Sequence, residues 1–201
     1  IQSPIAGVDG TLTVCEDDTS LDLTTGLDGT QQAGVWSDDN ATGALTGSVF
    51  NPSAVGAGTY VFTYTVSGGT SPCTTDTATV TVTVNPLPNA GNFVPTAPIC
   101  TSVGTFDLNT LLAGQDLGGN WLDATNTVIA NPINVTSLLA GIHQYNYQVT
   151  NLCGVDNQLV QLEILPIPQI LTTNVTIAPV CIGNNVVIQF SGMTDGTYTI
   201  N

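Results

Sequence analysis

The chain has 201 residues, with 15 acidic side chains, one histidine and neither lysine nor arginine, so its formal charge is −15. A chain without basic side chains cannot neutralise phosphates, which argues against nucleic-acid binding, and it has no lysine for a Schiff base and no arginine finger. Because only 7% of its residues are charged and its mean hydropathy is +0.27, it has enough apolar material for a packed core.

The residue pattern predicts short strands and negligible helix. Tyr60–Val66 alternates aromatic or apolar residues with threonine and valine, and Asp76–Val84 alternates valine with threonine. The segments Tyr145–Val149 and Val160–Ile164 repeat this pattern. A period of two is typical of half-buried antiparallel strands, and several such strands in 80 to 85 residues favour a β-sandwich.

The chain also contains an internal repeat. A cysteine, a tryptophan, an aromatic strand, a second cysteine and a Pro-x-Pro motif recur in the same order. The first-copy residues Cys15, Trp36, Tyr64, Cys73 and Pro86 correspond to Cys100, Trp121, Tyr147, Cys153 and Pro166. We therefore expect one module at 1–86, a second at 87–166 and the incomplete start of a third at 167–201. The third piece is too short to bury a core alone, so residues outside this chain or a partner chain must complete it.

The first residues lack the basic start and apolar core of a signal peptide, so we expect the chain to be an internal piece of a longer protein. No apolar run approaches the ~18 residues of a membrane helix, so no membrane insertion is expected.

Gly58-Thr59-Tyr60 and the strand that follows resemble immunoglobulin-like and PKD-like repeats of bacterial surface proteins. The order Pro-x-Cys, Trp, Gly-Thr-Tyr, Cys, Val-Thr-Val-Thr-Val and Pro-x-Pro looks most like the stalk modules of very large adhesins secreted by gliding Bacteroidetes. The resemblance implies an all-β fold, with tandem immunoglobulin-like β-sandwich modules arranged end to end on the cell surface.

The five cysteines fall as one pair per full module plus Cys181. We expect the disulfides Cys15–Cys73 and Cys100–Cys153, with Cys181 pairing beyond the chain. The alternative scheme crosses the module boundaries and joins Cys73 to Cys100 and Cys153 to Cys181. Pairing within a module is favoured because bridged Cα atoms must lie within ~7 Å, and either scheme implies an oxidising, extracellular setting.

Candidate binding and modification sites are few. The weak calcium candidates are Glu16, Asp17, Asp18, Asp38 and Asp39, because hard oxygen ligands suit calcium, and the alternative is solvated loop charge. No other cofactor or metal is expected. Thr77 lies in an Asp-Thr-Ala sequence similar to Bacteroidetes O-glycosylation acceptors, and Asn40, Asn134 and Asn174 begin Asn-x-Thr sequons.

No constellation typical of catalysis is found, so we expect no enzyme. The single histidine, His143, replaces Tyr60 in the repeat and is interpreted as a strand residue. Trp36 and Trp121 are interpreted as core residues rather than sugar-stacking platforms.

The favoured hypothesis is a structural stalk segment of a long secreted adhesin or filament, in which stiff Pro-x-Pro linkers join the modules. Its partners would be neighbouring repeats of the same chain and like chains in a filament. A related hypothesis, suggested by the incomplete third module, is polymerisation by strand exchange. The alternative is a carbohydrate- or protein-binding accessory module of a secreted multidomain enzyme, which would need an exposed aromatic row.

Overall fold

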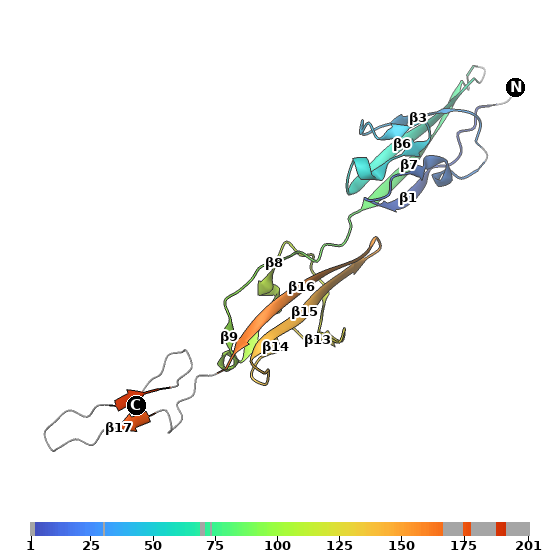
Figure 1. Ribbon diagram of the computed structural model, residues 1–201. Helices are drawn as coiled ribbons and strands as arrows, with labels where there is room; N and C mark the ends of the chain where they lie inside the picture. The colour runs from blue at the N-terminus through green and yellow to red at the C-terminus, as the bar shows by residue number, and fades with distance from the viewer. Residues whose placement is uncertain are drawn as a thin grey trace. The chain divides into compact units, whose positions relative to one another are not determined.

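The computed structural model describes residues 3–29, 31–68, 71–72, 74–166, 175–177 and 188–191. This part of the chain is all-β, with strands and short 3₁₀ turns but no α-helix (Figure 1). The predicted class and the predicted lack of helix are confirmed for these residues. No helix in the described ranges is long and apolar enough to cross a membrane. Of the predicted third copy, only β17 (Val175–Ile177), the antiparallel β18 (Ile188–Phe190) and Ser191 are described.

The chain divides into two compact units. Unit 1 comprises Ile1–Ala90, Gly114–Gly119 and Gln148–Asn157, and unit 2 comprises Gly91–Ala113, Asn120–Tyr147 and Gln158–Asn201. These bounds differ from the expected modules because two pieces of the second copy, a loop and a hairpin tip, belong to unit 1.

Unit 1 contains two sheets whose side chains meet in one core. The first sheet has the order β1-β7-β6-β3, and the second has the order β2-β5-β4. Strands β1 and β7 are parallel, whereas β7, β6 and β3 are antiparallel neighbours. The elements are β1 (Gly10–Cys15), β2 (Leu21–Asp22), η1 (Leu23–Gly26), β3 (Val35–Asp38), β4 (Leu45–Thr46), β5 (Val49–Phe50), η2 (Pro52–Ala54), β6 (Gly58–Ser67) and β7 (Thr75–Asn85).

The alternation predicted for β7 is present in the core. Val80, Val82 and Val84 are buried, and each contributes about 1.5–3 kcal/mol by leaving water. From the other sheet, the Phe50 ring lies 4.7 Å from that of Phe62 on β6. The same alternation therefore links the two sheets through one apolar cluster.

Unit 2 repeats the plan with a five-stranded sheet, β13-β12-β15-β16-β9, and two strand pairs, β10-β14 and β11-β8. Val160, Leu162 and Ile164 are buried, as the alternation predicted. The elements are β8 (Asn92–Phe93), β9 (Ile99–Cys100), η3 (Thr101–Val103), β10 (Thr105–Phe106), η4 (Leu108–Leu111), β11 (Leu112–Ala113), β12 (Asn120–Leu122), β13 (Val128–Ile129), β14 (Ile133–Asn134), β15 (Gly141–Asn151) and β16 (Gly154–Leu165).

The sequence repeat is a structural repeat at several positions. Val14 pairs with Val84 in parallel strands, and Ile99 pairs with Ile164 in the same way. The Trp36 ring lies 4.9 Å from that of Tyr64, and the Trp121 ring lies 5.0 Å from that of Tyr147. The two tryptophans therefore have like surroundings, as expected, although Trp121 is buried and Trp36 half-buried.

One strand changes sheet between the two units. In unit 1, β4 pairs with β5 in the three-stranded sheet, where Leu45 faces Phe50. The segment 83 residues later is β13, and it pairs with β12 in the five-stranded sheet, where Val128 faces Leu122. Strand β14, which is equivalent to β5, consequently has only β10 as a neighbour among the described residues.

The turns before these strands begin alike and then differ. In both, an aspartate accepts the N–H two residues on, Asp38 from Asn40 and Asp123 from Thr125, and a left-handed residue follows, Ala41 with φ of +53° or Asn126 with φ of +61°. In unit 2, the Asp123 N–H then donates to the Thr127 carbonyl and Asp123 Oδ1 accepts the Thr127 N–H, both at 3.0 Å, and the chain returns beside β12. In unit 1, the Asp39 N–H donates to the Val61 carbonyl at 3.2 Å and Asn40 Oδ1 accepts the Val61 N–H at 2.7 Å, and the chain continues to the other sheet.

Candidate functional site

A disulfide joins the first sequence copy to the second. Cys15, at the end of β1, is bonded to Cys153, in the turn between β15 and β16, with a Cα–Cα distance of 5.5 Å. Both residues belong to unit 1, because the tip of the β15–β16 hairpin is part of that unit. The chain segment between them spans 138 positions.

The predicted disulfides Cys15–Cys73 and Cys100–Cys153 are therefore wrong, as is the alternative bond from Cys153 to Cys181. Position 73 falls outside the described residues, and Cys100 has a free thiol. The reason is the parallel pairing of β1 with β7. Cys15 faces Asn85, at one end of β7, whereas the β6–β7 turn follows the pairing of Ser67 with Thr75 at the other end. Ten residues of strand separate these ends by roughly 33 Å, far beyond disulfide reach.

The same geometry excludes the second predicted bond. Cys100 faces Leu165 at one end of β16, and Cys153 lies beside Gly154 at the other. Neither distance could be read from the sequence, because the parallel pairing of β1 with β7 and of β9 with β16 is a feature of the tertiary structure.

Three carboxylates hold the Pro-x-Pro segment that follows β7. Leu87 N–H donates to Glu16 Oε1 at 3.1 Å, Asn89 N–H to Asp116 Oδ2 at 2.9 Å, and Ala90 N–H to Asp156 Oδ2 at 2.7 Å. Because Pro86 and Pro88 have no N–H, these three bonds serve every backbone donor from 86 to 90.

Further bonds come from the same neighbours. Asn151 Nδ2 donates to the Pro86 carbonyl at 3.0 Å, and Asn89 Nδ2 donates to the Gly114 carbonyl at 3.0 Å. We call Cys15, Glu16, the Pro-x-Pro segment 85–90, the loop 114–119 and the hairpin tip 148–157 the clamp. All of it belongs to unit 1.

The calcium candidates do not converge. Glu16 accepts the Leu87 N–H within the clamp, Asp18 Oδ2 accepts the Cys15 N–H at 2.9 Å, and Asp17 is exposed. Asp39 accepts hydroxyl hydrogens from Ser37 and Thr63. Within the described residues, no three acidic, histidine or cysteine side chains form a group that could hold a metal ion.

Asp38 closes the loop that leads to β4. Its Oδ2 accepts the Thr42 hydroxyl at 2.7 Å and the Gly43 N–H at 3.1 Å, and its Oδ1 accepts the Asn40 N–H at 3.2 Å. Burial tends to raise the pKa of this carboxyl, but the hydrogen bonds from Thr42, Gly43 and Asn40 outweigh it and lower the pKa. Its oxygens are thus used in local structure.

The modification candidates have different settings. Thr77 is an exposed residue of β7 between the buried Ala78 and the half-buried Asp76. Asn40 and Asn134 accept local hydrogen bonds through Oδ1, from Val61 and Thr136 respectively. Asn174 lies outside the described residues.

His143 takes the structural place of Tyr60, as the repeat predicted. The Tyr60 hydroxyl donates to the carbonyl of Gly56, four residues earlier, at 3.2 Å. His143 Nε2 lies 2.8 Å from the carbonyl of Leu139, also four residues earlier. Because a carbonyl only accepts, this nitrogen carries the proton. The imidazole thus ties the start of β15 to the preceding loop.

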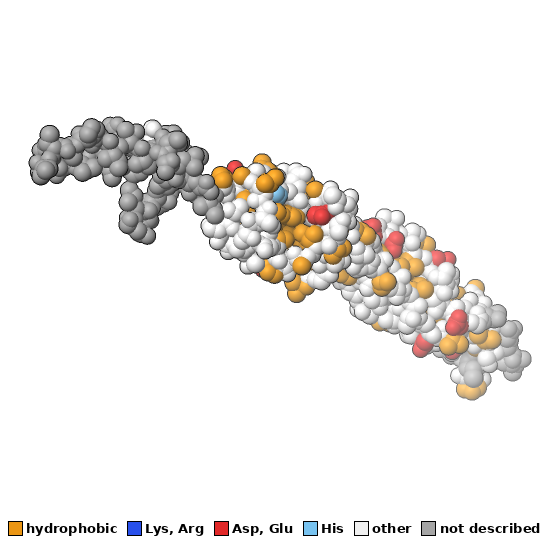
Figure 2. Space-filling view, turned by 90° about the horizontal axis from the view of Figure 1, so that it is seen from below, with side chains coloured by type: hydrophobic (Ala, Val, Ile, Leu, Met, Phe, Trp, Pro, Cys, Tyr) orange, Lys and Arg blue, Asp and Glu red, His pale blue; other side chains and the backbone are white. Residues whose placement is uncertain are grey.

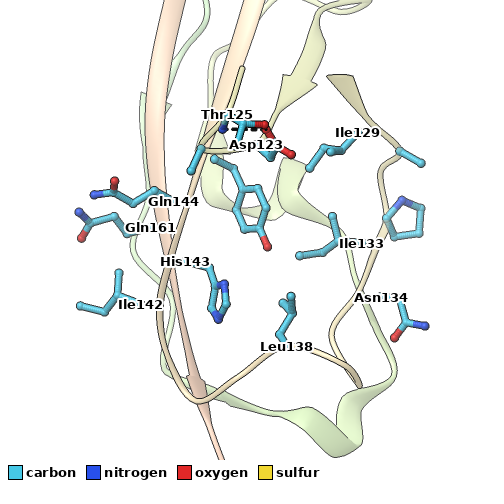
Figure 3. A pocket seen from close by; sticks show the side chains of 14 residues that line it. Asp123, Thr125, Ile129, Ile133, Asn134, Leu138, Ile142, His143, Gln144 and Gln161 are labelled. Carbon is cyan, nitrogen blue, oxygen red and sulfur yellow. Dashed lines mark hydrogen bonds between the residues drawn. The ribbon is translucent and has the colours of Figure 1, made fainter. Parts of the chain in front are cut away.

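A pocket of about 970 Å³ opens in unit 2, and sequence reasoning did not predict it. Figure 3 shows Ile133, Leu138 and His143 directed into one space from β14, the following loop and β15. Figure 2 shows hydrophobic side chains gathered beside the single pale-blue histidine. The lining residues are Asp123, Ala124, Thr125, Ile129, Ala130, Pro132, Ile133, Asn134, Leu138, Ile142, His143, Gln144, Tyr145 and Gln161.

The pocket is polar at one end. Hydrogen bonds from Thr125 and Thr127 lower the pKa of Asp123, so this residue is a carboxylate at neutral pH. Burial, followed by the negative charge of Asp123, raises the pKa of Tyr145, which stays a neutral phenol. Tyr145 is only 8% exposed, and its hydroxyl has no hydrogen bond in the described part of the chain.

A scan against protein-family models finds no match to this chain, and a search of curated proteins finds none either. The clamp and the pocket are therefore the features from which its function is inferred.

Proposed function

We propose that this chain is a structural stalk segment of a long secreted cell-surface adhesin or filament. The observation that carries the proposal is the disulfide between Cys15 of the first copy and Cys153 of the second. In the chain-entropy model, closing a loop of this length contributes about 5 kcal/mol. The bond also has a mechanical consequence. Tension applied to the two chain ends passes from Cys15 to Cys153 and bypasses the residues between them.

The modules of this stalk are tandem immunoglobulin-like sandwiches. Two features support this assignment. Two sheets, antiparallel except for the β1–β7 pair, face a shared core in unit 1. The Tyr60 hydroxyl donates to backbone carbonyls just upstream, as in the tyrosine corner of such domains. Hydrogen bonds within the clamp hold the Pro-x-Pro segment, which favours a stiff connection and an end-to-end arrangement of the modules.

The disulfide pattern extends to further repeats. Cys100 faces Leu165 in β16 as Cys15 faces Asn85 in β7, so the two cysteines hold equivalent positions. The Cys100 thiol is free, and it would bond to the hairpin cysteine of a following repeat. Cys73, the sequence equivalent of Cys153, would likewise bond to a preceding repeat. In this scheme each cysteine pair joins neighbouring repeats of one long chain.

Other observations support an extracellular and non-enzymatic role. Disulfides persist in oxidising compartments, and a chain without lysine or arginine offers no cleavage site to trypsin-like proteases. The one histidine bonds to a backbone carbonyl, and the rings of both tryptophans pack on tyrosines instead of forming an exposed sugar-stacking row. The role is therefore to extend a distal binding element from the cell.

Small-angle scattering of the oxidised 201-residue chain tests the stalk. A compact globule of this length would have a radius of gyration of about 17 Å. A stalk segment gives a clearly larger value with a rod-like distance distribution, and a compact profile would refute the proposal. Peptic mapping of a longer native chain without reduction tests the disulfide scheme. It should find Cys100 joined to the hairpin turn of the next repeat, and a Cys73–Cys100 peptide would contradict the scheme.

A further inference from the structure

The pocket of unit 2 occupies a place that unit 1 fills with its own chain. After β3, residues 39–46 of unit 1 run past β6 and then pair with β5. The Asp39 N–H donates to the Val61 carbonyl at 3.2 Å, and Leu45 faces Phe50 across the strand pair. Ala44 and Leu45 pack against the core of that unit.

In unit 2 the equivalent residues leave this path. The turn at Asp123 sends β13 back beside β12, so the second sheet lacks the strand that β4 supplies in unit 1. One wall of the pocket is formed by Ile133, the equivalent of Phe50, and by Tyr145, the equivalent of Phe62; each is 8% exposed, whereas the two phenylalanines are fully buried. The pocket is therefore a strand-sized gap on the outer edge of β14.

We propose that this gap binds an extended segment of a partner polypeptide, which takes the place of the missing strand. The segment lies along the start of β15, pairs with the edge of β14 and inserts one aliphatic side chain against Ile133. The Tyr145 hydroxyl has no partner among the described residues, and the hydrogen bonds of the Asp123 turn go to Oδ1 and leave Oδ2 available. Both groups offer hydrogen bonds to the backbone of the segment. Addition of a strand to a sheet edge is a common mode of peptide recognition.

The charge of the site excludes an acidic partner, because Asp123 is a carboxylate and the chain carries −15. The strand that fills unit 1 identifies the partner more closely. Residues 40–48 read Asn-Ala-Thr-Gly-Ala-Leu-Thr-Gly-Ser and carry no charged side chain. By this equivalence, the partner is an uncharged, Thr- and Gly-rich segment with one aliphatic residue.

The test uses a capped synthetic peptide of residues 40–48 as the probe and the oxidised full chain as the receptor. Two-dimensional NMR should show saturable shifts for residues around the pocket, between 123 and 145. A peptide with Leu45→Ser should bind about tenfold more weakly, because it forgoes burial of the leucine. Absence of binding at millimolar peptide, or equal binding of the two peptides, would overturn the proposal.

Two receptor variants locate the site. Ala130→Trp places a ring at an exposed lining position and should abolish binding, whereas Val128→Trp, on the same hairpin but outside the lining, should leave it unchanged. Each variant is first checked for a folded NMR spectrum. Binding that survives Ala130→Trp would refute the site. Saturation of the pocket by benzyl alcohol without any binding of the peptide would show a small-molecule pocket instead and would also refute it.

Discussion

Breaking the Cys15–Cys153 bond should lengthen the chain under force by a calculable amount. The bond closes a segment of 138 positions whose ends lie 5.5 Å apart between Cα atoms. A fully extended chain gains about 3.4 Å per residue. Opening the bond and unfolding the segment should therefore release roughly 470 Å of contour length. In the oxidised protein the disulfide prevents this length from being released, even where the applied force unfolds the segment.

The assay is single-molecule force spectroscopy on the chain held at both ends. The oxidised protein is compared with the double variant Cys15→Ser, Cys153→Ser, in which neither cysteine can find another partner. Cys100→Ser is the matched control and should behave as the unchanged protein, because Cys100 is a free thiol. Equal contour lengths for the oxidised protein and the double variant would refute the reasoning, since force would then not pass through this bond.

Three further predictions concern stability. Raising the salt concentration from low to about 0.5 M should raise the melting temperature, because 15 carboxylates repel one another and the chain has no lysine or arginine to offset them; a fall would contradict this reasoning. The pKa of Asp123 is lowered in the folded chain, so its ionised carboxylate stabilises the turn at pH values above the ordinary pKa of 3.8, and this stabilisation is lost as the pH falls through the folded pKa. NMR of the Thr125 amide should therefore show a change only on the acid side. The variant Asp123→Asn should remove this titration. Leu162→Ala should destabilise unit 2 by about 2–5 kcal/mol in chemical denaturation, whereas Leu139→Ala, at a position of the same unit that is 81% exposed, should change its stability by less than about 0.5 kcal/mol.

Much of the fold is readable from local pattern. The alternation in Asp76–Val84 and Val160–Ile164 predicted which residues are buried, because side chains of a strand alternate between its faces. The recurrence of tryptophan at matched offsets predicted like surroundings for Trp36 and Trp121, and each ring packs against a tyrosine ring in the structure. The substitution of Tyr60 by His143 predicted a strand residue, and both side chains bond to the carbonyl four positions back.

The pocket was not predictable in the same way. It arises where the segment after Asp123 pairs back through Thr127 and joins β12, whereas the equivalent segment of unit 1 joins the other sheet. The sequence shows that the short segments Leu45-Thr46 and Val128-Ile129 hold equivalent positions in the two copies, each a few residues after a turn-forming aspartate. Which sheet each segment joins depends on a competition between hydrogen bonds within the loop and bonds to β6 or β15, and that competition is decided in three dimensions.

The cysteines show the same division most sharply. The sequence by itself determines that the cysteines recur in the same order in both copies and that the chain is all-β with buried valine faces. Only the tertiary structure decides the partner of Cys15. Parallel pairing of β1 with β7 puts Cys15 at the end of the sheet opposite the hairpin turn of its own repeat, and the turn that reaches it belongs to the next copy. A covalent bond requires the two Cα atoms to approach within a few ångströms, and spacing along the chain does not report that distance.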